Sequence, residues 1–298
     1  MTNKNTKILL YGINGFIGKN LVAQLIKSKF DVYAISSSKN IEISIKDLKF
    51  FKKLKILRIA DLNSYIFDFA ILNSSPNNKE NNNKIFNESF NLYEKILHKL
   101  NKKITLVYLS SGIVCFENKL NKSNYLYRSY KKRMENLIKN YSFKHKNNYK
   151  ILRIYSSFGP YMPLQKYALG YLILSILKNK KLLLKSDGEF YRDFVFVNDL
   201  IKIIKSEIKI DRSLVLDIRS KKYYFKNLCN KIYEFYSLEN LISFGKEKDQ
   251  ISEYYAKNNS FVKSFPNFLF ENVLNSISVT LHWFKNVNYI KFKIKYEK

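Results

Sequence analysis

The chain has 298 residues, of which 46% are hydrophobic, which is enough for one or two domains with a buried core. Its formal net charge is +29, but the lysines are spread along the whole chain and form no cluster typical of a nucleic-acid-binding surface. Two cysteines do not make a disulfide framework, and three distant histidines lack the spacing of metal ligands. We therefore expect a soluble, cytoplasmic protein with no metal, no specific nucleic-acid partner, no signal peptide and no membrane insertion.

A strand and a glycine-rich loop open the chain. The apolar run Lys7–Tyr11 leads into glycines at positions 12, 15 and 18, which are three of only 8 in the sequence, and the amphipathic segment Leu21–Ile26 follows. Glycine lets a backbone turn tightly and approach a pyrophosphate, and the next helix points free N–H groups at it. The pattern predicts a dinucleotide site, although an ordinary strand-turn-helix loop is the alternative. Its predicted cofactor contacts are Gly12, Asn14, Gly15, Phe16, Ile17 and Gly18.

The second predicted strand, Phe30–Ile35, ends in three serines and a lysine instead of a carboxylate. An acidic residue at this place usually holds the ribose 2′-hydroxyl of NAD, and it would repel the 2′-phosphate of NADP. Ser36, Ser37 and Lys39 therefore favour NADP(H) slightly over NAD(H), unless they only form a polar loop in a lysine-rich protein. A third strand, Ile56–Ile59, precedes Asp61 and Leu62, which we expect beside the adenine, with a simple turn as the alternative for Asp61.

Strands and helices alternate through the first half of the chain. Further strands are predicted at Phe69–Leu72, Ile104–Leu109 and Lys150–Tyr155, with helices at Phe86–Leu100 and Tyr127–Tyr141. This alternation predicts an α/β protein with a Rossmann-type, doubly wound parallel sheet and a smaller, interwoven C-terminal substrate domain. Residues 1–160 and 195–222 are assigned to the dinucleotide-binding domain, and residues 161–194 and 223–298 to the substrate domain.

Beyond Pro160 the predicted elements change. We expect a helix at Tyr167–Lys178, strands at Leu182–Leu184 and Leu214–Ile218, helices after Tyr223, and a poorly patterned tail.

Three side chains form a candidate catalytic group. Ser111 follows the fifth strand, at the edge where a parallel sheet presents its ligands, and Tyr127 and Lys131 lie four residues apart on one predicted helix face. A free phenol has a pKa of about 10, which a neighbouring ammonium lowers, so that Tyr127 can exchange a proton near neutrality. Ser111 would hold the same substrate oxygen, and Lys131 would also hold the nicotinamide ribose. The Tyr-x-x-x-Lys spacing alone carries little weight among 23 tyrosines.

Together, the glycine loop, Ser111 and the Tyr127–Lys131 pair resemble the extended short-chain dehydrogenase/reductase family, of the NAD-dependent epimerase/dehydratase type that acts on nucleotide sugars. Leu152–Pro160 and Asp187–Leu200 are similar to two further family segments. The resemblance implies that Arg192 contacts the diphosphate of a nucleotide-diphosphate sugar and that Asn87 and Ser156 lie in the substrate site. It also implies a homodimer formed by the helices Phe86–Leu100 and Tyr127–Tyr141.

Two departures from the family narrow the expected activity. The Asp-Glu pair that 4,6-dehydratases carry after the catalytic hydroxyl is absent, because Gly112 and Ile113 follow Ser111. Ser156 also replaces a common Asn. We expect a keto-sugar reductase acting at ring position 4 for glycan biosynthesis, with a 4-epimerase holding NAD tightly as the alternative. A non-catalytic relative that senses dinucleotides or binds nucleic acid is a more remote one.

Overall fold

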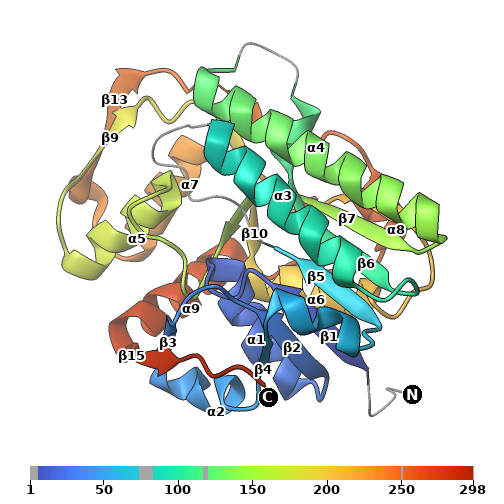
Figure 1. Cartoon of the computed structure of the whole chain (residues 1–298). Helices are drawn as coiled ribbons and strands as arrows, with labels where there is room; N and C mark the ends of the chain where they lie inside the picture. The colour runs from blue at the N-terminus through green and yellow to red at the C-terminus, as the bar shows by residue number, and fades with distance from the viewer. Residues whose placement is uncertain (1–5, 74–82, 117–119, 250, 298) are drawn as a thin grey trace.

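A seven-stranded sheet lies at the centre of the computed structural model, which describes residues 6–73, 83–116, 120–249 and 251–297 (Figure 1). Its strand order is β11-β7-β6-β5-β1-β2-β4, and each neighbouring pair is parallel. The strands are β1 (Lys7–Tyr11), β2 (Asp31–Ile35), β4 (Lys55–Leu57), β5 (Phe69–Leu72), β6 (Thr105–Ser111), β7 (Tyr149–Ile154) and β11 (Leu214–Asp217). This arrangement confirms the predicted Rossmann-type parallel sheet.

Helices cover both faces of the sheet because both faces carry apolar side chains. Ile8 and Leu10 of β1 pack into one buried cluster with α1 (Phe16–Lys27) and α6 (Val197–Glu207). Leu9 points the other way, into a second cluster with α3 (Asn83–Lys99) and α4 (Lys122–His145), which lie side by side in Figure 1. Successive strand residues face opposite sides, so a continuous apolar strand is typical of a sheet with helices on both faces.

A smaller group of strands and helices follows β7. In it, β10 (Tyr191–Phe196) pairs with β8 (Ser156–Phe158), β12 (Lys222–Tyr224) and β14 (Glu253–Tyr254). A second pair joins β9 (Leu182–Ser186) to β13 (Ile242–Glu247). The helices here are α5 (Ala168–Lys178), α7 (Phe225–Phe235), α8 (Ser260–Ser264) and α9 (Val273–Asn286). The chain returns to the main sheet through α6 and β11, and the domain boundaries given above stay a prediction.

The C-terminal segment has more structure than its sequence pattern indicates. Its last strand, β15 (Tyr289–Lys293), pairs antiparallel with β3 (Asn40–Ser44), which was not predicted either. The reason is that each strand of this ribbon depends on a partner about 250 residues away. Short helical turns complete the chain at α2 (Leu48–Phe51), η1 (Ile45–Asp47), η2 (Ile59–Ser64), η3 (Gly112–Cys115) and η4 (Glu239–Leu241).

The described residues contain neither a membrane-spanning helix nor a cluster of metal-binding side chains. Within the described ranges, no helix has both the length and the apolar character needed to cross a bilayer. Across the same part of the chain, no group of three or more His, Cys, Asp or Glu side chains is placed to hold a metal ion.

Candidate active site

The fold of the protein itself requires two glycines in the loop after β1, one for its backbone conformation and the other for close packing. Gly12 has a positive φ of 96°, a backbone conformation that side chains with a Cβ rarely adopt. A Cβ on Gly18 would lie 2.1 Å from the carbonyl oxygen of Gly12. The first turn of α1 therefore packs directly on the end of β1, and this contact sets the position of the helix N-terminus.

The third glycine has no such internal role. Gly15 precedes α1 in an extended conformation, and a Cβ there would meet only the Gly12 oxygen, at 3.6 Å. No side chain caps the helix and no acidic residue lies in its first turn, which begins with the half-buried Phe16 and Ile17. Exposed N–H groups beside an open approach fit the pyrophosphate of a dinucleotide, which is the chemistry that the sequence predicts for this turn.

The loop after β2 is joined to the glycine turn by hydrogen bonds. The Asn14 amide donates to the hydroxyl of Ser38, and the Ser36 hydroxyl lies 3.4 Å from Asn14 Oδ1. Ser37 and Lys39 are exposed in the same loop. The structure thus brings together the residues predicted for the phosphate end and the ribose end of a cofactor. Asp61 and Leu62 lie in η2, just beyond β4, where Leu62 is fully buried and Asp61 is half-buried.

The predicted catalytic group comes from β6 and α4. Ser111 ends β6, and the Lys131 Nζ lies 5.8 Å from the centre of the Tyr127 ring one helical turn away. Lys131 is buried and donates to the Leu109 carbonyl oxygen at 3.0 Å. Burial lowers the pKa of Lys131 to about 7, although the nearby Glu135 carboxylate raises it. A lysine with this pKa can gain or lose its proton at neutral pH, beside the phenol that would use it.

Sequence reasoning missed one residue of this group, Tyr254. Its hydroxyl lies 3.0 Å from Ser111 Oγ, and its ring centre lies 5.2 Å from the rings of both Phe116 and Tyr155. Burial raises the pKa of Tyr254, and the nearby Tyr127 phenol contributes to that rise. Tyr254 therefore contacts Ser111 and lies close enough to Tyr127 for the two phenols to interact electrostatically. No motif marks it, because it belongs to β14, a two-residue strand in the segment without a clear pattern.

Arg192 lies beside Tyr254 because β10 pairs with β14 in that register. Its guanidinium forms an ion pair of 2.8 Å with Asp249, donates to the Ile251 carbonyl oxygen at 2.7 Å and stacks 4.2 Å from the Phe190 ring centre. The guanidinium of Arg192, which is predicted to bind a phosphate, thus has its charge and hydrogen-bond partners within the protein in this structure. Ser156 is half-buried on β8, which pairs with the later part of β10, at Phe194 to Phe196.

Asn87 lies apart from these residues. It is exposed on α3 and accepts a hydrogen bond of 2.8 Å from Arg133 of α4. Arg133 is six residues after Tyr127, which places it on a different face of α4 from the Tyr127–Lys131 pair. The structure therefore brings Asn87 to the surface between the two helices and not to Ser111.

A buried charged network supports the strand end that carries Ser111. The Glu135 carboxylate accepts hydrogen bonds from Ser110 Oγ at 2.7 Å and from Arg153 Nε and Nη2 at 2.9 and 2.7 Å. The bidentate contact raises the pKa of Arg153. Two hydrogen-bonded charges that satisfy each other can be buried at an acceptable cost, and here they join β6, α4 and β7.

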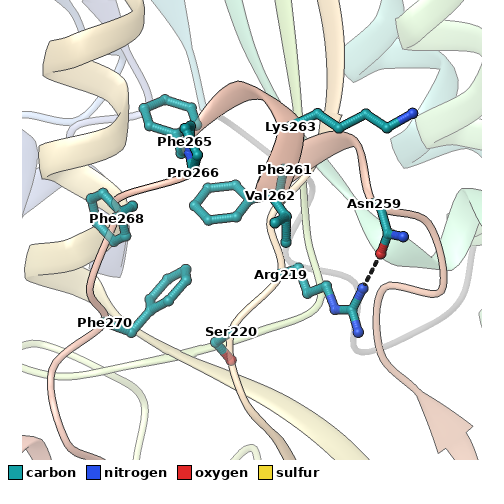
Figure 2. Close-up of a pocket in the computed structure, with 10 residues that line it drawn as sticks. All are labelled: Arg219, Ser220, Asn259, Phe261, Val262, Lys263, Phe265, Pro266, Phe268 and Phe270. Atoms are coloured by element: carbon teal, nitrogen blue, oxygen red, sulfur yellow. Dashed lines mark hydrogen bonds between the residues drawn. The ribbon is translucent and has the colours of Figure 1, made fainter.

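A cavity of about 580 Å³ lies elsewhere in the C-terminal part of the protein. Figure 2 shows four phenylalanine rings around it and the Arg219 side chain, hydrogen-bonded to Asn259, at its edge. It is lined by Arg219, Ser220, Asn259, Phe261, Val262, Lys263, Phe265, Pro266, Phe268 and Phe270. None of the predicted site residues lines it, so the candidate active site is a different region.

Comparison with known proteins agrees with this fold. The sequence pattern of the NAD dependent epimerase/dehydratase family matches residues 8–208. The structure is similar to a UDP-N-acetylglucosamine 4-epimerase from Methanobrevibacter ruminantium M1, with 20% identity and a TM-score of 0.76 over 95% of this chain and 99% of that one. It is also similar to a UDP-glucose 4-epimerase from Thermotoga maritima, with 17% identity and a TM-score of 0.74 over 94% and 99% of the two chains.

A third solved structure, a dTDP-glucose 4,6-dehydratase from Bacillus anthracis in complex with NAD, has 17% identity and a TM-score of 0.72 over 94% of this chain and 96% of that one. No curated protein matches by sequence. The match over two thirds of the chain shows that this protein belongs to the NAD-dependent epimerase/dehydratase family.

The two roles of the glycine loop can be separated by substitution. We expect Gly18→Ala to lower the free energy of unfolding by about 1–3 kcal/mol, because its Cβ would collide with backbone. Gly15→Ala should cost less than about 1 kcal/mol, the size of a lost cap preference, yet weaken NAD(P)H binding more than about tenfold. Urea unfolding and fluorescence titration measure the two effects. Full cofactor affinity in Gly15→Ala would show that no pyrophosphate lies there.

The buried amine predicts a pH-dependent stability. With a pKa of about 7 in the folded state and 10.5 when exposed, Lys131 binds a proton only in the unfolded state between these values. Stability therefore rises with pH through this window. Lys131→Met removes the effect, so its stability relative to wild type should fall by about 2 kcal/mol between pH 7 and pH 9. Urea unfolding of both proteins at the two pH values measures it, and a constant difference would contradict the assigned pKa.

Proposed function

We propose that the protein is an NAD(P)-dependent oxidoreductase acting on a nucleotide-diphosphate sugar, and that it reduces a keto group at ring position 4. The observation that supports this proposal most is the Tyr127–Lys131 pair on one face of α4, with Lys131 hydrogen-bonded to the Leu109 carbonyl two residues before Ser111. Ser111 ends β6, Tyr127 and Lys131 lie on α4, and the glycine turn follows β1 at the same carboxyl edge of the parallel sheet. A binding protein without catalysis would not need all three.

Each side chain has a distinct part in the proposed reaction. A bound nicotinamide supplies the hydride for the sugar carbon. Tyr127 gives its phenolic proton to the sugar oxygen, and Ser111 holds that oxygen by a hydrogen bond. Lys131, with its pKa lowered to about 7, returns a proton to Tyr127 and binds the nicotinamide ribose. Tyr254, now hydrogen-bonded to Ser111, forms the wall of the sugar site and gives up that bond when a sugar oxygen replaces it.

The sugar nucleotide would be held through its diphosphate by Arg192. A planar guanidinium suits a bidentate phosphate contact, but here it is paired with Asp249. Binding therefore exchanges a carboxylate for a phosphate. Ser156, at the neighbouring strand, contributes to the same site, whereas the surface position of Asn87 does not support the substrate contact expected for it.

Two sequence features bear on the reaction: the first favours net reduction over epimerisation, and the second disfavours dehydration. The end of β2 carries no carboxylate, which favours NADP(H), and no Asp-Glu pair follows Ser111. The alternative is a 4-epimerase that keeps its NAD bound, and it is supported by the solved 4-epimerases of similar fold. The two are distinguished by a keto-sugar nucleotide assay. A reductase consumes one NADPH per product, whereas an epimerase interconverts two sugars without added cofactor.

The proposed location, oligomeric state and pathway are based on membership of the family. We propose a cytoplasmic homodimer that serves glycan biosynthesis, with α3 and α4 as the contact between subunits. These helices lie together on the outside of one sheet face (Figure 1), and Phe143 of α4 is 90% exposed there.

Replacing Tyr127 by Phe removes the proposed proton donor and keeps the ring. We expect the rate of sugar reduction to fall about 10²–10⁴-fold, the usual contribution of a general acid, while NADPH affinity changes little. Tyr125→Phe is the matched control, because Tyr125 lies on the same helix, is 56% exposed and should keep full activity. Steady-state kinetics and cofactor titration test both variants. An active Tyr127→Phe enzyme would refute the assignment.

The ion pair between Arg192 and Asp249 predicts that removal of the Asp249 charge increases the affinity for a UDP-sugar. Asp249→Asn removes the charge that competes with the substrate diphosphate, so a UDP-sugar should bind about three- to tenfold more tightly, a gain of about 0.7–1.4 kcal/mol. Arg192→Gln should weaken the same binding by a larger factor. Isothermal titration with UDP-glucose, at constant ionic strength, measures both. Weaker binding in Asp249→Asn would show that Arg192 is a structural residue only.

A further inference from the structure

The C-terminal segment is attached along the loop that follows β2. The pairing of β15 with β3 is extended by backbone hydrogen bonds from Ile45 N to the Asn288 oxygen, at 2.9 Å, and from Ile294 N to the Lys39 oxygen, at 3.0 Å. In Figure 1 the red β15 lies beside the blue β3, at the same end of the molecule as α2. The end of the chain is thus anchored beside the residues predicted to meet the cofactor ribose.

Tyr296 continues this contact onto the edge of the main sheet. It forms a parallel bridge with Ile56 of β4, and Glu297 N donates to the Ile56 oxygen at 2.8 Å. Its hydroxyl donates to the backbone oxygen of Ser36, the residue after β2, at 3.1 Å. The ring of Tyr296 is therefore held across the carboxyl ends of β2 and β4.

Arg58 stacks on this ring. It is the first residue after β4, and its guanidinium carbon lies 5.3 Å from the centre of the Tyr296 ring. The side chain is exposed, and among the described residues no carboxylate forms an ion pair with it. Stacking on one face leaves the edge of a guanidinium, with its N–H donors, available to a planar or tetrahedral anion.

The position of this cation suggests its ligand. In dinucleotide folds the end of the second strand faces the adenosine ribose, and a nearby arginine accommodates a 2′-phosphate. Residues 36–39 provide no carboxylate that would repel such a phosphate, and Lys39 adds a second positive charge. Glu297 follows Tyr296 but is exposed and forms no ion pair with Arg58 in the part of the chain that the structure describes.

We propose that Arg58, positioned by Tyr296 of the C-terminal segment, binds the 2′-phosphate of NADP(H), so that the last residues of the chain complete the cofactor site and set its preference. This inference rests on the proposed use of a nicotinamide dinucleotide. It adds the residues that determine whether NADP(H) or NAD(H) is preferred. Tyr296 acts through Arg58 and is a positioning residue.

The test uses two fragments that differ in a single phosphate, 2′,5′-ADP and 5′-AMP, titrated into the full-length protein by calorimetry. Wild type should bind 2′,5′-ADP more tightly. Arg58→Gln should weaken 2′,5′-ADP about ten- to hundredfold, as expected for a charge-assisted contact, and change 5′-AMP less than about twofold. Tyr296→Ala should reduce the same preference, and Tyr296→Phe, which keeps the ring, should retain most of it.

Lys53→Gln is the control, because it removes one positive charge at an exposed position before β4, at the opposite end of that strand. It should leave both affinities within about twofold, as expected for a screened charge. Thermal unfolding confirms that each variant is folded. An equal loss of affinity for both fragments in Arg58→Gln, or a wild-type protein that binds 5′-AMP more tightly than 2′,5′-ADP, would overturn the inference. NADH binding would then still support the proposed function, whereas failure to bind either NADH or NADPH would refute that function itself.

Discussion

The position of the predicted site depends on the close contact between Gly18 and the Gly12 carbonyl. It allows α1 to begin directly above the end of β1, with its free N–H groups turned toward the sheet edge. Since the seven strands are parallel, the same edge also carries the ends of β2, β4 and β6. The glycine turn, the serine-rich loop, η2 and Ser111 are therefore neighbours in space although they span about a hundred residues.

Burial gives the catalytic region its chemistry. Lys131, Glu135 and Ser110 are all less than 5% exposed, and each has a hydrogen-bond partner. Burial of the Lys131 amine costs stability and brings its pKa toward neutrality. The Glu135–Arg153 pair holds two buried charges against each other and joins three elements around Ser111. The protein thus tolerates an unfavourable ionisable group at the place where proton transfer is proposed, and a buried hydrogen-bonded network lies beside that group.

The C-terminal part of the chain contributes contacts that occupy several of the predicted site residues in this structure. Asp249 and Tyr254 occupy Arg192 and Ser111 with internal partners, so the substrate binding proposed here would exchange existing bonds for new ones. The ribbon of β3 and β15 brings Tyr296 to the other end of the predicted cofactor site. Tyr254 lies in the two-residue strand β14, Asp249 follows β13, and Tyr296 forms an isolated bridge with Ile56. Such short segments depend on the surrounding fold more than on local propensity.

The sequence by itself determined the sheet, its strands and the glycine turn, because buried apolar strands and a cluster of three glycines are local signals. It also determined the helical spacing of Tyr127 and Lys131, which depends only on the turn of a helix. The tertiary structure alone decided that Asn87 faces Arg133, that Arg192 pairs with Asp249, and that Tyr254 reaches Ser111. Such contacts join residues up to 260 positions apart, as for Tyr296 and Ser36, and no local pattern encodes which distant side chain will arrive.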